Sequence, residues 1–153
     1  MMRRRISMVF CLVILAALSA VSSPRGALAG MVLITPDEAR LPTPKDVFAS
    51  RAITRGPHID LAGRDEGHLR SPLPLQLKFR GFGGATINLD SLRVTYMKSP
   101  NVDLTQRVRP YAGPDGIEIQ EAEVPPGEHL LRVELQDSEG RRTTTTFLLS
   151  VTP

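Results

Sequence analysis

The residues best suited to chemistry are gathered in one polar segment. His58, Asp60, Asp65, Glu66 and His68 occupy a stretch of eleven positions. Imidazole nitrogens and carboxylate oxygens are ligands of zinc and copper. Their spacing matches no established metal motif, and the residues between them favour loops, so a solvated loop is the main expectation. The alternative is a metal site that uses His58, Asp60 and His68.

Catalytic motifs are missing from the sequence. Gly-x-Ser-x-Gly does not occur. The run from Gly81 to Gly84 lacks the Lys-Ser/Thr pair of a phosphate-binding loop, and we expect it to turn the chain between strands. Glu118, Glu121 and Glu123 lack the residue order of a calcium loop, which indicates a charged outer face. The sequence therefore predicts a non-enzymatic protein without a cofactor.

Four residues are candidates for contact with a partner protein. Phe82 lies in the glycine-rich turn. We expect its ring to be tucked under the core, since phenylalanine is mostly buried, and the alternative is an exposed anchor for a partner. Thr144, Thr146 and Leu148 share one face of the last expected strand, which could accept another strand if it lay at a sheet edge. The neighbouring pair Arg141–Arg142 would oppose such pairing.

The secondary structure expected around these residues consists of strands. From Pro72 onward, apolar residues alternate with polar ones, which is typical of half-buried strands. The alternating residues are Leu73, Leu75, Leu77, Phe79, Leu92, Val94, Tyr96, Leu131, Val133, Leu135, Phe147, Leu149 and Val151. Short strands joined by Gly, Pro and Asn turns predict an antiparallel sandwich or a small barrel.

Three finer features follow from the same pattern. The Asn-Leu-Asp-Ser sequence at 88–91 predicts a turn. Val102, Leu104 and Val108 predict a further strand. His129 follows the parity of Leu131, and we expect it in a turn at the end of the sheet rather than as a ligand.

Residues 30–71 are less regular and resemble a lead-in arm. Thr35 and Glu38 have the spacing of a capping box, and Pro36 suits the first position of a helix. Pro42 then stops the helix after about one turn. The later part of the arm is either partly disordered or packs as a first edge strand.

Residues 1–29 have the three parts of a secretory signal peptide: Arg3–Arg5, the apolar run Ile6–Leu18, and the small-residue cleavage site that ends at Ala29. The single cysteine, Cys11, lies in the apolar run, so the exported chain would have no disulfide, which fits a bacterial periplasm better than a eukaryotic secreted module. We expect a periplasmic or secreted protein, cleaved near Ala29 and without a membrane span.

Export also changes the interpretation of charge. The whole chain has 19 basic and 16 acidic residues, a formal charge of +3. Arg3, Arg4, Arg5 and Arg25 precede the expected cleavage site, which leaves 15 basic residues against 16 acidic ones. The basic balance therefore belongs to the signal peptide and predicts no nucleic-acid partner.

Two segments carry a family resemblance. "VPPGEHLLRVELQDSEGRRTTTTFLLSV" resembles the closing hairpin of bacterial immunoglobulin-like and fibronectin type III-like domains, and "ATINLDSLRVTYMKSPNVDLTQRV" resembles an earlier strand of such modules. The resemblance covers Leu73 to Val151 and implies fold rather than activity. The wider chain, with "ITPDEA" and "AITRGPHI", resembles small exported proteins of proteobacteria.

Together these observations predict an all-β, antiparallel immunoglobulin-like sandwich of about seven strands at 72–153. An irregular arm at 30–71 and a signal-peptide helix at 1–29 would precede it. The predicted function is a binding or interaction module whose partner is another periplasmic or envelope protein. The alternatives are a small metal-binding or carrier protein and an accessory subunit of an enzyme complex.

Overall fold

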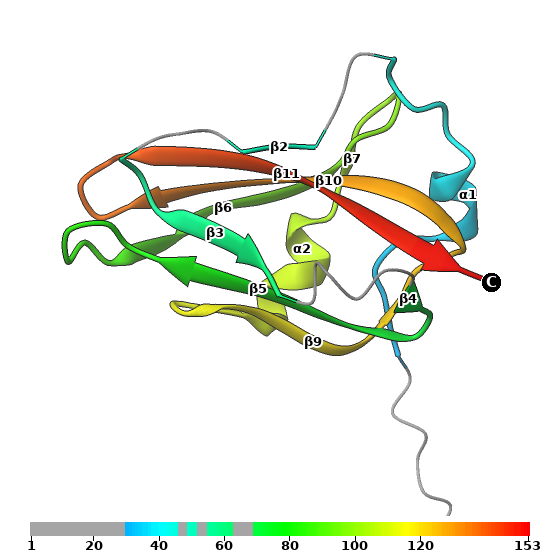
Figure 1. Ribbon diagram of the computed structural model, residues 1–153, viewed down its shortest axis with the longest axis horizontal. Coiled ribbons are helices and arrows are strands. Elements are labelled where there is room, and N and C mark those ends of the chain that lie inside the picture. The colour runs from blue at the N-terminus through cyan, green and yellow to red at the C-terminus, as the bar shows by residue number, and fades with distance from the viewer. Residues whose placement is uncertain (1–29, 46–48, 52–54, 63–68) are drawn as a thin grey trace, which may run out of the picture.

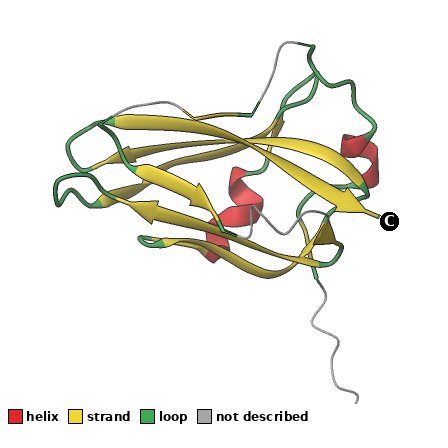
Figure 2. Ribbon diagram, viewed as in Figure 1, coloured by secondary structure: helices red, strands yellow, loops and turns green. Residues whose placement is uncertain are grey.

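The computed structural model describes residues 30–45, 49–51, 55–62 and 69–153. Most of them belong to strands, and the strands form two sheets that lie face to face, as the two yellow layers in Figure 2 show. This confirms the predicted mostly-β class. The expected signal-peptide helix and His68 lie outside the described residues.

The first sheet, sheet A, has the strand order β1-β9-β5-β3 (Figure 1). Its strands are β1 (Met31–Val32), β3 (His58–Leu61), β5 (Leu73–Arg80), β8 (Ala112–Gly113) and β9 (Gly116–Glu123). β3 and β9 flank β5 in antiparallel pairing, and β1 runs parallel to the end of β9. The short β8 pairs with the start of β9.

The second sheet, sheet B, has the order β2-β11-β10-β6-β7, with β4 pairing in parallel with the end of β11. Its strands are β2 (Ser50–Arg51), β4 (Leu69–Arg70), β6 (Ile87–Tyr96), β7 (Val102–Asp103), β10 (Gly127–Asp137) and β11 (Arg142–Thr152). The hairpin of β10 and β11 is paired without interruption from Gly127↔Val151 to Gln136↔Arg142.

The alternating apolar residues predicted from the sequence form the core between the sheets. All thirteen are at most 5% exposed. Leu33, Ile34 and Ile59 join the same core from the expected arm, each at most 1% exposed. Because β1 pairs with β9 and β3 pairs with β5, the described residues of the expected arm contribute strands and core side chains to this body.

The predicted capping box is present in helix α1 (Pro36–Ala39). The Glu38 backbone N–H donates to Thr35 Oγ1 at 3.3 Å, and the Thr35 N–H donates to Glu38 Oε2 at 2.9 Å. Two otherwise unpaired donors are thus satisfied by two side chains only three residues apart, which is why this feature could be read from the sequence.

The strand predicted from Val102 to Val108 is wrong beyond its first two residues. Helix α2 (Thr105–Val108) and the 3-10 helix η1 (Arg109–Tyr111) follow β7 directly. Asp103 Oδ1 accepts a hydrogen bond from the Thr105 N–H at 2.8 Å and starts the helical turn. Leu104 and Val108 are both buried, and a spacing of four residues puts two side chains on one face in a helix and in a strand alike.

The turn predicted at 88–91 is also wrong, because β6 continues through it. Asn88 Oδ1 accepts from the Asp90 N–H at 3.1 Å, while Ser91 Oγ donates to Asn88 O at 2.6 Å. Ser91 Oγ also accepts from the Gln136 N–H at 2.8 Å, where the register between β6 and β10 shifts after Glu134. The turn-forming side chains therefore support a β-bulge instead of a reversal.

A buried hydroxyl in β11 gives a stability prediction. Within the part of the chain that the structure describes, Thr145 Oγ1 is the buried side-chain polar atom that has no hydrogen-bond partner. Thr145→Val removes this hydroxyl at almost the same shape, so we expect the free energy of unfolding to rise by about 1 kcal/mol. Urea unfolding would measure it. Thr143 lies on the same face and has an interaction partner, so Thr143→Val should bring no such gain. Equal effects of the two changes would contradict this account.

Candidate functional site

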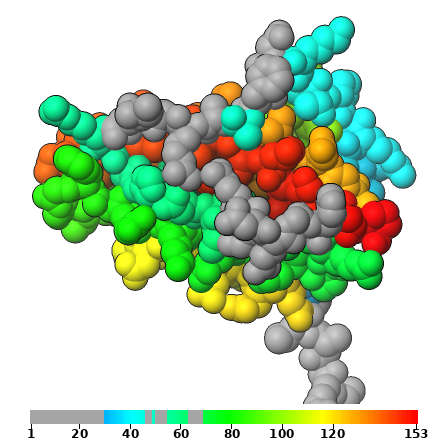
Figure 3. All heavy atoms as spheres, in the orientation of Figure 1, coloured from blue at the N-terminus to red at the C-terminus, as the bar shows by residue number. Residues whose placement is uncertain are grey.

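Two turns that are far apart in the sequence meet at one end of the molecule. Residues 81–86 join β5 to β6, and residues 138–141 join β10 to β11. The Ser138 N–H donates to Thr86 O at 2.9 Å, and the Thr86 N–H donates to Ser138 Oγ at 3.2 Å. Figure 3 shows these green and orange segments side by side at the left. We call the two turns together the loop end.

Phe82 is the exposed apolar residue of the loop end. Its side chain is 54% exposed, so the ring is an outward anchor and is not tucked under the core. Gly83 and Gly84 follow with φ of 64° and 84°, the left-handed region that favours glycine. The Arg141 guanidinium carbon lies 5.5 Å from the centre of the Phe82 ring, and Arg141 Nη2 donates to Phe82 O at 2.8 Å.

Arg141 is itself fixed by Asp137, which is 2% exposed. Arg141 Nε donates to Asp137 Oδ2 at 2.8 Å, and Asp137 Oδ1 accepts from the backbone N–H groups of Glu139 and Arg141 at 3.0 Å each. Burial raises the pKa of Asp137, but the hydrogen bonds from Arg141 and Glu139 outweigh it and hold the pKa below its usual value. The buried Asp137 carboxylate thus holds Arg141 in place, and Arg141 in turn contacts Phe82.

Two of the three predicted metal ligands lie on one face of the edge strand β3. His58 Nε2 is 2.8 Å from Asp60 Oδ2, and Arg80 Nη2 from the neighbouring strand is 3.3 Å from the same oxygen. The guanidinium already supplies a positive charge to Asp60. Among the described residues, no three His, Cys, Asp or Glu side chains gather as a metal-binding group. Since His68 is not described, the metal site stays a prediction.

The predicted partner face of β11 is only partly accessible. Thr144 and Leu148 are exposed, Leu148 by 44%, but Thr146 is 3% exposed and so is not an available contact. β2 pairs with β11 at Thr145 and Thr146, and β4 pairs with it at Val151 and Thr152. β2 and β4 therefore occupy parts of the β11 edge that, from the sequence, a partner strand could have used. The alternation within β11 could not show this, because it does not reveal which strands lie beside β11.

His129 is not a turn residue as predicted, because it lies inside β10 and is 2% exposed. Its Nε2 is 2.8 Å from Pro125 O, so Nε2–H donates to that carbonyl. In the neutral ring Nδ1 is then an acceptor, and the Tyr96 hydroxyl donates to it at 2.8 Å. Burial lowers the pKa of His129 and raises the pKa of Tyr96 to about 12, so both groups are neutral at pH 7.

Lys98 lies beside this pair and binds the last residue of α1 and Thr43, which follows the helix. Its Nζ donates to Ala39 O and to Thr43 Oγ1, each at 3.0 Å, and lies 5.2 Å from the centre of the Tyr96 ring. Lys98 is 6% exposed, and burial lowers its pKa. Because these polar groups satisfy one another, we interpret them as a structural connection rather than a reactive site.

Glu38 and Arg107 form a second connection between α1 and the rest of the body. Arg107 donates to the two carboxylate oxygens at 2.8 and 2.7 Å, and to Leu33 O at 2.9 Å. The hydrogen bonds from Arg107 are the main cause that lowers the pKa of Glu38 to about 2. The sequence indicates Glu38 only as part of the capping box and gives no sign of Arg107, because a partner 69 positions away leaves no local pattern.

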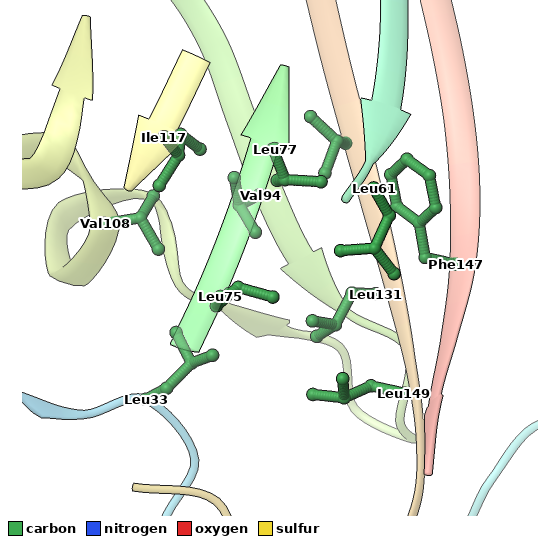
Figure 4. Close-up of a pocket in the computed structure, with 11 residues that line it drawn as sticks. Leu33, Leu61, Leu75, Leu77, Val94, Val108, Ile117, Leu131, Phe147 and Leu149 are labelled. Carbon is green, nitrogen blue, oxygen red and sulfur yellow. The ribbon is translucent and has the colours of Figure 1, made fainter. Parts of the chain in front are cut away.

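A small apolar cavity lies between the sheets (Figure 4). Eleven aliphatic and aromatic side chains line it, including Leu33, Leu75, Leu131 and Phe147. Its volume of about 10 Å³ leaves room for at most one water molecule, and an apolar cavity of that size stays dry. We interpret it as a packing void of the core and not as a ligand site.

Two larger hollows are open to the surface. One of about 750 Å³ lies over sheet A and the turn at 113–116. The other, of about 300 Å³, lies over β6, β10 and β11 beside the bulge. Charged and amide side chains contribute to the lining of both, and neither was predicted, because residues from several strands form each.

The chain matches no protein-family model, no curated protein and no solved structure. Among the described residues, no helix has the length and apolar character that crossing a membrane would require.

Proposed function

We propose that the protein is an exported, non-enzymatic interaction module that contacts a partner protein through the loop end. The observation that carries this proposal is Phe82, half exposed and seated on Arg141, which is in turn held by the buried Asp137. Aromatic and arginine side chains are enriched among the residues that dominate binding energy. A side chain that is already ordered loses less conformational entropy when a partner binds.

We also propose an immunoglobulin-like strand order for the two sheets. β3, β5 and β9 of sheet A would correspond to strands A, B and E, and the order β7-β6-β10-β11 of sheet B to strands C′, C, F and G. These are seven strands, with α2 and η1 standing where strand D would run. The sequence resemblance over Leu73 to Val151 supports the same assignment.

This assignment supports the location of the binding surface. The turns of the loop end would then be the B–C and F–G loops, which carry binding residues in antibody variable domains. Fold analogy alone does not assign function, so it is the contacts of Phe82 and Arg141 that support this surface. The signal-peptide pattern of residues 1–29 places the expected partner in the periplasm or the envelope.

Replacing Phe82 tests the proposal. We expect Phe82→Ser to weaken binding of the partner at least about tenfold, because it removes the aromatic anchor. The free energy of unfolding should change by no more than about 0.5 kcal/mol, since the side chain is exposed. The measurement is photo-crosslinking in the host cell from an amino acid placed at position 82, followed by affinity measurement with the captured protein.

Val32 offers a matched control, because it is 45% exposed and lies in β1, outside the loop end. Val32→Ser should leave the affinity unchanged, and a crosslinker at position 32 should not capture the same protein. The proposal is wrong if both positions capture the same partner equally, or if Phe82→Ser binds it as tightly as the wild type.

A further inference from the structure

The hollow over sheet A lies apart from the loop end and shares no residue with it. It has a volume of about 750 Å³, within the usual range of small-ligand sites, although it is more open and more polar than most of them. Its floor is made by β5 between β3 and β9, which Figure 1 shows as neighbouring strands, and one wall is made by η1 and the turn at 113–116. Paired strands give such a site a rigid base.

One wall of the hollow carries an exposed aromatic ring. Tyr111 is 41% exposed, at the end of η1, where Ala112 continues directly into β8. A tyrosine side chain offers an apolar face together with a polar hydroxyl, so it suits a ligand that has both kinds of surface. Among the large hydrophobic side chains exposed in the described residues, Tyr111 is the one that lines this hollow.

The floor presents a regular grid of hydrogen-bonding groups. In the register of sheet A, Gln76 lies opposite Glu118, and Lys78 lies opposite Asp60. Gln76, Lys78 and Glu118 are exposed on the outer face of their strands. Such groups repeat about every 7 Å along a strand and about every 5 Å across strands. A repeating ligand could therefore meet similar partners at several points.

The charges of the hollow select against a strongly charged ligand. Lys78 and Arg80 are basic, while Asp60, Asp115 and Glu118 are acidic. Arg80 is paired with Asp60 at 3.3 Å, and Gln120 Nε2 donates to Glu118 Oε1 at 2.6 Å. An anion would meet these carboxylates, and a cation would meet the lysine and arginine. A hydroxyl can donate to a carboxylate and accept from an ammonium or guanidinium group.

From these observations we propose that the hollow binds an uncharged, hydroxyl-rich glycan chain. The apolar face of one sugar ring lies against the Tyr111 ring, and its hydroxyl groups bond to Gln76, Lys78 and Glu118. The adjacent ion pair of Arg80 and Asp60 forms the far end of the surface. This inference does not depend on a partner protein at the loop end, because the two surfaces have different residues.

Titration with neutral hexasaccharides tests the proposal. The probes are the hexamers of glucose, xylose and N-acetylglucosamine, added to the isotope-labelled protein while its amide NMR signals are recorded. We expect at least one hexamer to shift signals of β5, β9 and residues 111–116, with a dissociation constant on the order of 1 mM or tighter. Tyr111→Ala should weaken this binding at least about tenfold, and Gln76→Ala by a smaller factor.

A control variant and the Gln76 variant make the result decisive. Phe82→Ser should bind the hexamer as the wild type does, because it lies at the loop end. Gln76 is exposed in the middle of β5, so its variant stays informative even if Tyr111→Ala alters the fold. The proposal is overturned if no neutral hexamer shifts these signals. It is also overturned if Tyr111→Ala and Gln76→Ala both bind the hexamer as the wild type does, or if binding is confined to acidic glycans and disappears with added salt.

Discussion

Leu33→Ala is expected to lower the free energy of unfolding by about 2–5 kcal/mol, the usual cost of truncating a fully buried leucine. Leu33 is 0% exposed and lines the cavity between the sheets together with Val94 and Leu131 from sheet B (Figure 4). Its backbone N–H also donates to Glu123 O at 3.0 Å. A cost of this size would be a large fraction of the stability of a small domain. Urea unfolding followed by circular dichroism would measure it.

The neighbouring residue supplies the control for this prediction. Val32 is 45% exposed, so Val32→Ala should change the free energy of unfolding by no more than about 0.5 kcal/mol. If Leu33→Ala lowered the free energy of unfolding as little as Val32→Ala, residues 30–34 would not be part of the core and would be a dispensable arm.

Glu38→Gln is the second change with a large expected effect. The pKa of Glu38 falls from 4.5 to about 2, chiefly through its hydrogen bonds from Arg107. A difference of this size between the unfolded and folded states corresponds to about 3 kcal/mol of stability at neutral pH. We therefore expect Glu38→Gln to lose about that amount, because a neutral amide leaves Arg107 without its opposite charge.

The pH dependence of stability distinguishes this mechanism from simple loss of packing. Because the folded pKa of Glu38 is depressed, its contribution is complete above the unfolded value of 4.5 and is lost as the pH falls toward 2. In wild-type protein, the urea midpoint should drop through this window, and in Glu38→Gln that part of the drop should disappear. Equal slopes in the two proteins would show that the ion pair is not responsible.

His129 contributes equally in the two proteins and so does not confuse the comparison. Burial lowers its folded pKa, so as the pH falls below about 6.5 the unfolded chain takes up a proton before the folded protein does. Stability should therefore decline below that pH in the wild type and in Glu38→Gln alike.

Asp37→Asn is the matched control for Glu38→Gln in α1. The Asp37 side chain is 92% exposed and its pair with Arg40 lies at the surface, so this change should have little effect on the free energy of unfolding.

Several features of the fold could be predicted because short-range rules decide them. A residue in a strand faces the side opposite to its neighbour, so the alternation of Leu73, Leu75 and Leu77 showed which side chains would be buried. The capping box of Thr35 and Glu38 is likewise complete within four residues. The rules failed where one pattern serves two structures, as with Leu104 and Val108 in α2.

The candidate surfaces could be predicted less fully, because the strands that form them are distant in the sequence. Phe82 was named from its glycine-rich turn, but its exposure depends on Arg141, 59 positions later. Thr146 was named from alternation, yet β2 pairs with β11 beside it and the residue is buried. The hollow over sheet A needs several strands and η1 at once, and no single segment indicates it.

Local patterns in the amino-acid sequence were enough to show which strand residues face the core, where the one-turn helix α1 begins, and that the chain is built mainly from strands. Which strands are neighbours became clear from the folded chain, and with them the contacts of Glu38 with Arg107, of Tyr96 with His129, and of Phe82 with Arg141. This is because periodicity within a strand specifies the face of each side chain. It leaves open the partner strand, which depends on how all the apolar faces are buried together.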